Sequence, residues 1–353
     1  MYDAIIIGAG VSGLHAAWKL EQAGKNVLVL EARGRIGGRI LSANINNNND
    51  RLDLGATWIW PGEWRVDTLI KELGLKTFTQ YEKGSMLYDS EGGTTPIPQG
   101  GSGVLSLRIK GGIASITDSL AHKLRAGSIK LSHEVKAIVL DKDGSINVDA
   151  DDDRSYLSRN ILLAIPPALA INNIKFFPQL PQSFSQIAAI TPVWMGVIIK
   201  TVIIYETPFW RDAGYSGTVM STLGPLQEIH DMCGEDGSPA ALFGFSALQN
   251  TEQNAPVEHS VVQQLIRIFG KAASKPRGLI IQDWSKEVYT SRKDVAYFQD
   301  YSLFGDSIYD AAYLGVGLHF CSCETYGRNG HIEDALAASD RAVKAALRNN
   351  KIK

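Results

Sequence analysis

Three glycines near the N-terminus have the types and spacing of a phosphate-binding turn. In the stretch GAGVSG, Gly8, Gly10 and Gly13 follow the GxGxxG pattern between an apolar run and an expected helix. The first glycine permits a tight turn, the second lets a pyrophosphate approach the backbone, and the third lets the helix pack on the sheet. Glu31 stands about 20 residues further on, where a carboxylate accepts hydrogen bonds from ribose hydroxyls. The pattern therefore predicts a dinucleotide site rather than a merely glycine-rich turn.

A lysine inside an apolar strand is the second chemical candidate. Lys200 stands in the stretch MGVIIKTVIIYETPFWRD, where valine, isoleucine and threonine surround it. A β-branched run of this kind predicts a strand that is buried on at least one face. The lysine then either extends its ammonium group to solvent or stays in a dry pocket for a functional reason. The residues alone leave both alternatives open.

The composition predicts a two-lobed protein without a polyanionic partner. The chain has 353 residues, of which 44% are hydrophobic, and this is more than one domain normally holds. A formal net charge of -2 argues against nucleic acid or an anionic membrane surface as a partner. No apolar run approaches the roughly 20 residues of a membrane-spanning helix. Because cysteines are few and the first residues read as a strand, we expect a cytoplasmic location.

Alternating strands and helices position the glycine turn. A strand at Asp3–Ile7, a helix at Ser12–Gln22 and a second strand at Val27–Leu30 form a β-α-β unit, whose strands pair in parallel. Near the end of the chain, the apolar residues from Ile332 to Leu347 recur at helical spacing. The sequence therefore predicts an α/β fold.

A second group of elements is expected around Lys200. The pattern predicts a hairpin over Met86–Ile97 and strands over Ala241–Ser246 and Leu279–Gln282. A helix is expected at Val257–Phe269. These elements would build the second lobe.

The residues after Glu31 carry a resemblance to a known family. The stretch EARGRIGGRI resembles the continuation of the dinucleotide turn in flavin amine oxidases, where arginines flank a Gly-Gly pair beside the pyrophosphate and the flavin edge. LDLGATWIWPG, KGGIASITDSL, HEVKAIVL and LLAIPPALA are similar to later segments of that family, in the same order. The strand of Lys200 resembles a monoamine oxidase strand, and LHFCSCETYGRNGHIEDALAA looks like the closing FAD segment. The chain is thereby identified as a shortened member of the flavin-containing, monoamine oxidase-like family.

The resemblance implies a fold and a division into domains. We expect a Rossmann-like FAD-binding domain of the p-hydroxybenzoate hydroxylase-like type and a second, mixed-sheet substrate domain, both discontinuous in sequence. The FAD-binding domain would comprise residues 1–60, 105–165 and 305–353. The substrate domain would comprise residues 61–104 and 166–304.

The resemblance also implies which residues contact FAD. The glycine turn and Glu31 would meet the pyrophosphate and ribose, and Val135 would meet the adenine. Counted from Trp284, the position of the family's flavin-attaching cysteine holds Lys293, so we expect the FAD to be non-covalent. The expected cofactor-binding residues are Gly8, Gly10, Gly13, Glu31, Arg33, Arg39, Gly55, Ala56, Thr57, Val135, Ser322, Cys323, Glu324 and Ile332.

Four residues are catalytic candidates from the same resemblance. Lys200 is implied to reach a water beside flavin N5, where its charge would stabilise oxygen as it is reduced. Trp284 occupies the family position alongside the flavin ring. Asp294 and His331 stand where monoamine oxidases carry two aromatic residues that flank the amine. Because a carboxylate there favours the ammonium form, we expect polyamines or cyclic amines to be better substrates than simple monoamines.

Two further departures from the family pattern bear on partners. The missing length falls between Tyr81 and Gly111, so we expect the pocket to be open or to be closed by a second copy of the chain in a homodimer. Cys321 and Cys323 form a C-x-C pair, but no other cysteine or histidine cluster completes a metal site, and we expect no metal.

The leading interpretation is an FAD-dependent amine oxidase whose partners are a small amine and oxygen. A hydride would leave the carbon bearing nitrogen for flavin N5, and oxygen would reoxidise the flavin to give hydrogen peroxide. Two alternatives stay open: an FAD-dependent desaturase or dehydrogenase of a non-amine substrate, and an FAD-binding protein without turnover. An amino-acid oxidase is disfavoured because those relatives carry an arginine in the segment where this chain has Thr57.

Overall fold

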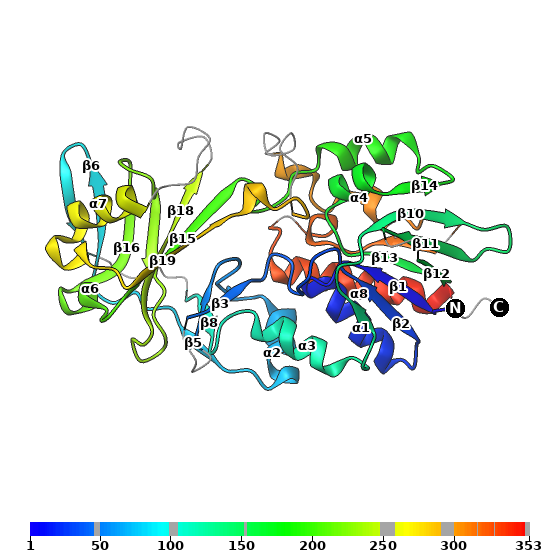
Figure 1. The fold of residues 1–353 in the computed structure, drawn as a ribbon, viewed down its shortest axis with the longest axis horizontal. Helices are drawn as coiled ribbons and strands as arrows, with labels where there is room; N and C mark the ends of the chain where they lie inside the picture. Colours follow the sequence, from blue (N-terminus) through cyan, green and yellow to red (C-terminus); the bar gives the residue numbers. More distant parts are fainter. Residues whose placement is uncertain are drawn as a thin grey trace.

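Three main sheets are spread along the long axis of the molecule (Figure 1). The computed structural model describes residues 1–45, 50–98, 105–151, 154–247, 258–290, 300–315, 317–327 and 329–349. A five-stranded and a four-stranded sheet lie towards the end that holds the N-terminus, and a seven-stranded sheet lies at the opposite end (Figure 1).

The five-stranded sheet is parallel throughout and is buried on both faces. Its order is β20-β13-β1-β2-β9, with strands β1 (Ala4–Ile7), β2 (Val27–Leu30), β9 (Ile129–Lys130), β13 (Ile161–Leu163) and β20 (Leu318–Phe320). Successive side chains of β1 point to opposite faces, so Ile6 packs into one hydrophobic cluster and Ile5 into another. Burial on both faces explains the uninterrupted apolar runs of these strands.

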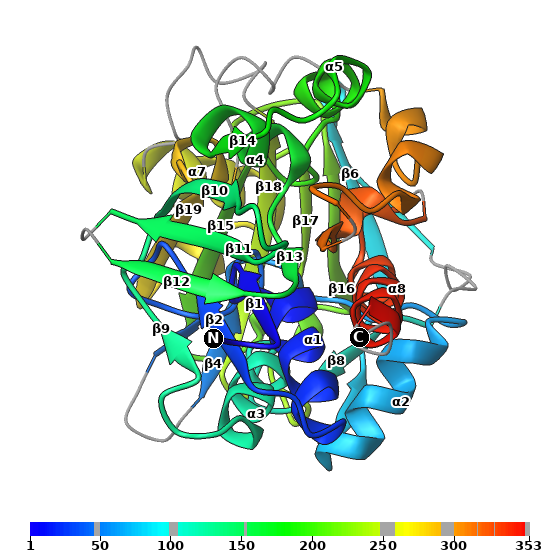
Figure 2. The ribbon, with the colours of Figure 1, turned by 90° about the vertical axis from the view of Figure 1, so that its right-hand side faces the viewer.

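Two helices cover one face of this sheet, and the predicted β-α-β unit is confirmed. Helix α1 (Val11–Gln22) begins one residue before the predicted start, and its Leu14 packs in the same cluster as Ile6. Helix α8 (Ile332–Asn349) lies beside α1 and adds Leu336 to that cluster (Figure 2). These contacts fix the start of α1 directly after the glycine turn.

The four-stranded sheet covers the other face. Its order is β12-β11-β10-β14, with β10 (Val135–Leu140), β11 (Ile146–Ala150), β12 (Ser155–Ser158) and β14 (Lys175–Phe177). Strands β10, β11 and β12 are antiparallel, whereas β14 runs parallel to β10. Helices α4 (Pro167–Asn173) and α5 (Gln182–Ile190) flank β14 in the chain. Strand β14 thus lies in residues 166–304, which were assigned to the substrate domain, but it pairs with β10, which lies in the residues assigned to the FAD-binding domain. The division into domains stays a prediction.

The seven-stranded sheet is mixed and contains the lysine strand. Its order is β19-β15-β18-β17-β16-β6-β7, and only the β16–β6 pair is parallel among its described ladders. The strands are β6 (Ser85–Ser90), β7 (Gly93–Ile97), β15 (Ile198–Tyr205), β16 (Tyr215–Ser221), β17 (Glu228–Asp231), β18 (Ala240–Ala247) and β19 (Gly278–Asp283). The short helix α6 (Phe209–Asp212) follows β15, and helix α7 (Glu258–Phe269) packs against the sheet. A second lobe with a mixed sheet, as predicted, is present.

Shorter elements connect the two ends of the molecule. They are β3 (Ser42–Asn44), β4 (Arg51–Asp53), α2 (Trp64–Leu73), β5 (Thr77–Thr79), β8 (Leu107–Ile109) and α3 (Ser115–Lys123). Helix α2 packs against α8 and α3 (Figure 1). Within the described part of the chain, no helix combines the length and apolar character that crossing a bilayer demands.

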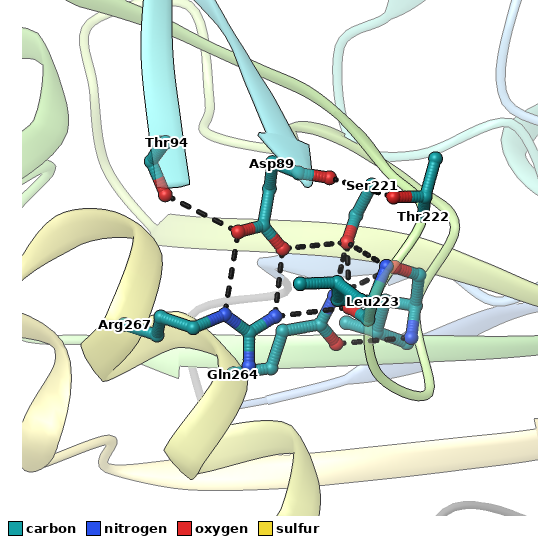
Figure 3. A network of polar contacts seen from close by, with 8 residues as sticks. Asp89, Thr94, Ser221, Thr222, Leu223, Gln264 and Arg267 are labelled. Atoms are coloured by element: carbon teal, nitrogen blue, oxygen red, sulfur yellow. Dashed lines mark hydrogen bonds and ion pairs between the residues drawn. The ribbon is translucent and has the colours of Figure 1, made fainter. Parts of the chain in front are cut away.

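A buried carboxylate joins helix α7 to the far edge of the seven-stranded sheet (Figure 3). Asp89 on β6 is fully buried and accepts hydrogen bonds from Arg267 at 2.7 Å and from Ser221 at 2.6 Å. The amide of Gln264, one turn before Arg267, donates to the carbonyls of Leu223 and Leu226. Because every polar group of this clamp has a partner, it can stay buried without a large desolvation cost.

Candidate active site

A single cavity brings together most of the predicted site residues. Its volume is about 450 Å³, and it extends from the carboxyl ends of β1 and β2 to the side chains of β15, β17 and β18. The predicted residues that line it are Gly8, Gly10, Glu31, Arg33, Arg39, Gly55, Ala56, Thr57, Val135, Ser322, Cys323, His331 and Ile332. The other predicted residues that the structure describes, Gly13, Lys200, Trp284 and Glu324, stand behind this lining. Asp294 lies outside the described residues, as do Lys293 and the rest of 291–299.

The glycine turn leaves room for an anion at the start of α1. Gly8 has a positive φ of 103°, and a Cβ there would lie 2.8 Å from the Ala164 carbonyl oxygen. A Cβ on Gly13 would lie 2.0 Å from the Gly8 oxygen, so the close approach of helix and strand requires glycine. A Cβ on Gly10 would meet no atom within 4 Å and would project into open space at the cavity wall. Since α1 has neither a side-chain cap nor an acidic residue in its first turn, its free amides and dipole suit a pyrophosphate.

Glu31 ties the end of β2 to both sides of the glycine turn. Its buried carboxylate accepts hydrogen bonds from the Ala9 amide at 2.7 Å and from the Arg33 amide at 2.9 Å. Each carboxylate oxygen keeps a further lone pair that can accept from a ribose hydroxyl. Arg33 turns to the other lobe, where it pairs with Glu287 at 3.1 Å. The Glu31 carboxylate is therefore held rigidly at the cavity wall.

The C-terminal segment closes the cavity on the opposite side. Arg39 forms an ion pair of 2.6 Å with the fully buried Glu324 and donates to the Cys323 sulfur at 3.2 Å. The Ser322 hydroxyl oxygen is buried in this wall and has no hydrogen-bond partner among the described residues. An unpartnered hydroxyl at a cavity wall is suited to a polar group of a bound cofactor.

Burial raises the pKa of both thiols in the C-x-C pair, to about 12 in the case of Cys321. Both cysteines, like Cys233, are buried and free of disulfides. Across the described residues, His, Cys, Asp and Glu side chains do not gather in threes that could hold a metal ion.

Lys200 is completely buried, and the alternative in which its ammonium reaches solvent is wrong. The Nζ atom donates to the Gly55 carbonyl at 3.1 Å and to the Thr57 hydroxyl, and it lies 4.2 Å from the centre of the Phe243 ring. Burial lowers the pKa of Lys200 to about 7, an effect that Asp53 opposes and Arg108 reinforces. The amine is therefore held directly behind two residues of the cavity wall, with both protonation states accessible near neutral pH.

Trp284 supports this wall from behind. It is fully buried at the start of a 3-10 turn, Trp284–Lys286, and its indole nitrogen donates to the Leu54 carbonyl at 2.9 Å. Since Trp284 is not among the lining residues, its position differs from the expectation that it lies alongside the flavin ring. The adjoining Gly55 is constrained, because a Cβ there would lie 1.9 Å from the Arg39 carbonyl oxygen.

His331 lies in the cavity wall with a partner that the sequence reasoning missed. Its Nδ1 atom is 3.1 Å from Oε1 of Glu63, whose Oε2 accepts from the Trp60 amide at 3.0 Å. Because a carboxylate accepts hydrogen bonds, Nδ1 carries the proton in this pair, and in the neutral imidazole Nε2 is then the acceptor. The Trp194 ring stands 6.3 Å from the imidazole. Glu63 immediately precedes α2, and its only sequence signal was a glutamate among the tryptophans of WIWPGEW.

A second carboxylate–imidazole pair was also missed. Glu228 lines the cavity, and its Oε1 lies 2.6 Å from Nε2 of His230. The His230 ring packs between Trp58 and Phe243, at centroid distances of 4.9 Å and 5.4 Å. Trp58 also lines the cavity, together with Trp60, Trp194 and Phe245. The seven-stranded sheet therefore contributes Phe245 and one carboxylate to the cavity, whereas Trp58 and Trp60 come from the segment before α2.

Comparisons with known proteins agree on one family. The family model described as flavin containing amine oxidoreductase matches residues 11–100 and 97–347. The probable flavin-containing monoamine oxidase A of Dictyostelium discoideum is 25% identical over 460 aligned residues, which cover 100% of this chain and 99% of the relative. The putrescine oxidase of Kocuria rosea is 24% identical over 461 aligned residues, covering 98% and 95%. The flavin-containing amine oxidase A of Sus scrofa is 26% identical over 459 aligned residues, covering 98% and 85%.

Solved structures show the same fold. Wild-type putrescine oxidase bound to putrescine superposes with a TM-score of 0.83 at 22% identity, covering 98% of this chain and 99% of that one. Cyclohexylamine oxidase from Brevibacterium oxydans superposes with a TM-score of 0.84 at 21% identity and the same coverage. Since the family model spans nearly the whole sequence, the chain belongs to the flavin containing amine oxidoreductase family.

Proposed function

We propose that the chain oxidises amines with a non-covalently bound FAD. The observation that carries this proposal is one cavity with two different ends. One end offers the uncapped start of α1 and the Glu31 carboxylate, and the other lies over the buried amine of Lys200. The open space at Gly10 and the unpartnered Ser322 hydroxyl fit a dinucleotide between them.

Two features support the finer assignments of cofactor and domain. Burial keeps the Cys323 thiol protonated by raising its pKa, and a neutral thiol is a poor nucleophile for attachment to a flavin. The parallel five-stranded sheet next to an antiparallel β10–β12 meander supports a Rossmann-like domain of the p-hydroxybenzoate hydroxylase-like type. We assign residues 1–60, 105–165 and 305–353 to it, and residues 61–104 and 166–304 to the substrate domain, although β14 joins the sheet of the former.

Around the cofactor, the chain orients the substrate and excludes water. When bound, FAD supplies an acceptor for a hydride from the carbon that carries the amine nitrogen, and oxygen regenerates it with release of hydrogen peroxide. The aromatic lining of Trp58, Trp60, Trp194 and Phe245 keeps the substrate end apolar. In its protonated form, Lys200 places a positive charge behind Gly55 and Thr57, where it stabilises negative charge on oxygen.

His331 is assigned the removal of a proton from the incoming ammonium. An ammonium has no lone pair to assist the departure of a hydride, so the amine must become neutral first. Glu63 fixes the imidazole with Nε2 as acceptor, which is the state required of a base. Among the described residues, Glu63 is the carboxylate next to His331, and Asp294 lies outside them. Trp284 is assigned a supporting role behind Gly55.

Anaerobic reduction of the flavin tests the proposal. Purified holoprotein is mixed without oxygen with separate panels of amines, amino acids and saturated ring compounds, and the flavin absorbance is followed. We expect amines to bleach the flavin and to yield hydrogen peroxide once air is admitted. Bleaching by ring compounds alone would identify a desaturase, and no bleaching by any compound would identify a flavin-binding protein without turnover.

A further inference from the structure

Residues 287–290 follow β19 in the stretch assigned to the substrate domain, yet they reach the dinucleotide end of the cavity. Tyr289 and Thr290 line the cavity together with Glu31, just after β2, and Val135, at the start of β10. Glu31 and Val135 are the residues that we expect to meet the ribose and the adenine of FAD. The segment therefore lies where the adenosine part of the cofactor is expected.

Arg33 holds this segment with its whole guanidinium group. Its Nη2 atom donates to the Glu287 carboxylate at 3.1 Å and to the Thr290 hydroxyl at 2.8 Å. Its Nη1 atom donates to the Tyr289 carbonyl at 3.4 Å, and the guanidinium carbon lies 5.4 Å from the centre of the Tyr289 ring. Because an arginine stays charged and its donors lie in one plane, these contacts tie the segment to the end of β2 in one geometry.

A second contact joins the segment to the start of β10. The Tyr289 hydroxyl donates to Oε2 of Glu134 at 3.1 Å, and Lys136 pairs with Oε1 of the same carboxylate at 2.7 Å. Burial and the Glu134 carboxylate raise the pKa of Tyr289, so the hydroxyl keeps the proton that it donates. Glu134 immediately precedes Val135 and lines the cavity with it. The segment is therefore held on two sides of the expected adenosine site, at β2 by Arg33 and at β10 by Glu134.

The segment can move without disturbing a sheet. Within the described residues, its backbone hydrogen bonds stay in its own turns, from the Glu287 amide to the Trp284 carbonyl at 3.2 Å and from the Thr290 amide to the Glu287 carbonyl at 2.7 Å. Val288 is 67% exposed, so the outer side of the segment faces solvent. The fully buried Trp284 fixes the point from which the segment leaves. Opening would thus cost the side-chain contacts and no strand pairing.

We propose that residues 287–290 form a strap that closes over the adenosine end of the FAD and controls its entry and release. This inference rests on the proposed FAD site and goes beyond it, since it gives a role in cofactor retention to residues of the substrate domain. Arg33 and Glu134 hold the strap in its closed state. Because the proposed FAD has no covalent bond to the chain, the closed strap is the barrier to its loss. Entry and release both require the open state, so the balance between the two states sets both rates.

The kinetics of FAD release and binding test the strap on the full chain. Release is followed on the holoenzyme as exchange of labelled FAD against an excess of unlabelled FAD, and binding is followed by mixing the flavin-free protein with FAD. Tyr289→Phe removes only the hydroxyl that donates to Glu134, and Thr290→Val removes the acceptor of Arg33 at nearly constant side-chain volume. Tyr88→Phe is the control, because Tyr88 is exposed on β6 and is not part of the cavity lining.

A strap predicts that both rates rise when one of its contacts is lost. Tyr289→Phe and Thr290→Val should each speed FAD release by about 5- to 20-fold, as loss of one hydrogen bond to a charged group would give, and should also speed FAD binding. The control should keep both wild-type rates. Faster release with unchanged or slower binding would show ordinary contacts or local damage instead of a strap, and would overturn the inference. Unchanged release in both variants would overturn it as well, with the FAD site left standing. Wild-type protein that binds no FAD would overturn the proposed function itself.

Discussion

Replacing Lys200 with methionine should stabilise the flavin-free protein against unfolding at neutral pH. Burial lowers the pKa of Lys200 from 10.5 to about 7, whereas in the unfolded chain the ammonium is hydrated. Folding at neutral pH must therefore either release a proton or bury a charge. Methionine has a similar length and does neither, so the variant avoids this cost.

The free-energy cost of burying Lys200 follows from how far its pKa is lowered. The difference of 3.5 units between 10.5 and about 7, at about 1.4 kcal/mol per unit, gives a cost of about 5 kcal/mol when Lys200 is protonated in both states. Because the folded-state pKa is lowered, this cost is complete below pH 7 and disappears as the pH rises towards 10.5. It is about 4 kcal/mol at pH 7 and about 1 kcal/mol at pH 9.5. Loss of the donor to Gly55 and Thr57 subtracts about 1–2 kcal/mol from the variant's gain at every pH.

Urea unfolding at two pH values measures the effect. The wild type, Lys200→Met and a control, Lys175→Met, are prepared without flavin and followed by tryptophan fluorescence at pH 7 and pH 9.5. Lys175 is exposed on β14, so its replacement should leave the pH dependence as in the wild type. The advantage of Lys200→Met over the wild type should shrink by about 3 kcal/mol between the two pH values. An advantage that is the same at both would refute a buried amine with a lowered pKa.

Three further predictions concern the holoenzyme. In stopped-flow measurements, Lys200→Met should slow reoxidation of the reduced flavin by oxygen about 30- to 150-fold, because about 2–3 kcal/mol of charge stabilisation is lost. Flavin reduction should change little. If the rate of reoxidation by oxygen were unaltered, Lys200 would have a purely structural role. Acid precipitation should leave the yellow colour in the supernatant, whereas colour in the pellet would reveal a covalent link. Glu63→Gln should lower the rate of flavin reduction about 10- to 100-fold by releasing His331, with Glu63→Asp recovering part of it. Equal rates of flavin reduction in the wild type, Glu63→Gln and Glu63→Asp would show that Glu63 does not contribute to the reaction.

Local patterns in the sequence predicted the elements that hold the dinucleotide end. Apolar runs buried on both faces and a glycine spacing set by backbone geometry are properties of neighbouring residues, so β1, α1 and β2 were placed to within one residue. The burial of Lys200 was one of two alternatives. It depends on which residues cover β15, and the strand alone does not contain that information.

The substrate end depends on contacts between distant residues. Glu63 and His331 are 268 positions apart, and they meet only because α2 packs against α8. Glu228 lines the cavity only in the register that sets Phe245 on β18 opposite both Lys200 on β15 and Glu228 on β17, and one residue of slip would turn Glu228 away from the cavity. Strand β14 was missed for the same reason, since its three residues are a strand only by pairing with β10.

A ribosome completes the hairpin of β6 and β7 long before it makes Arg267. Asp89 and Arg267 are 178 positions apart, so the carboxylate of the nascent hairpin has no guanidinium to neutralise it. Burying it alone would cost several kcal/mol, so we expect the hairpin to stay hydrated until α7 has been synthesised. Strands β6 and β7, which are synthesised first in this sheet, are thus expected to be buried last. In a nascent chain that stops before residue 258, helix α7 is missing and cannot cover Asp89.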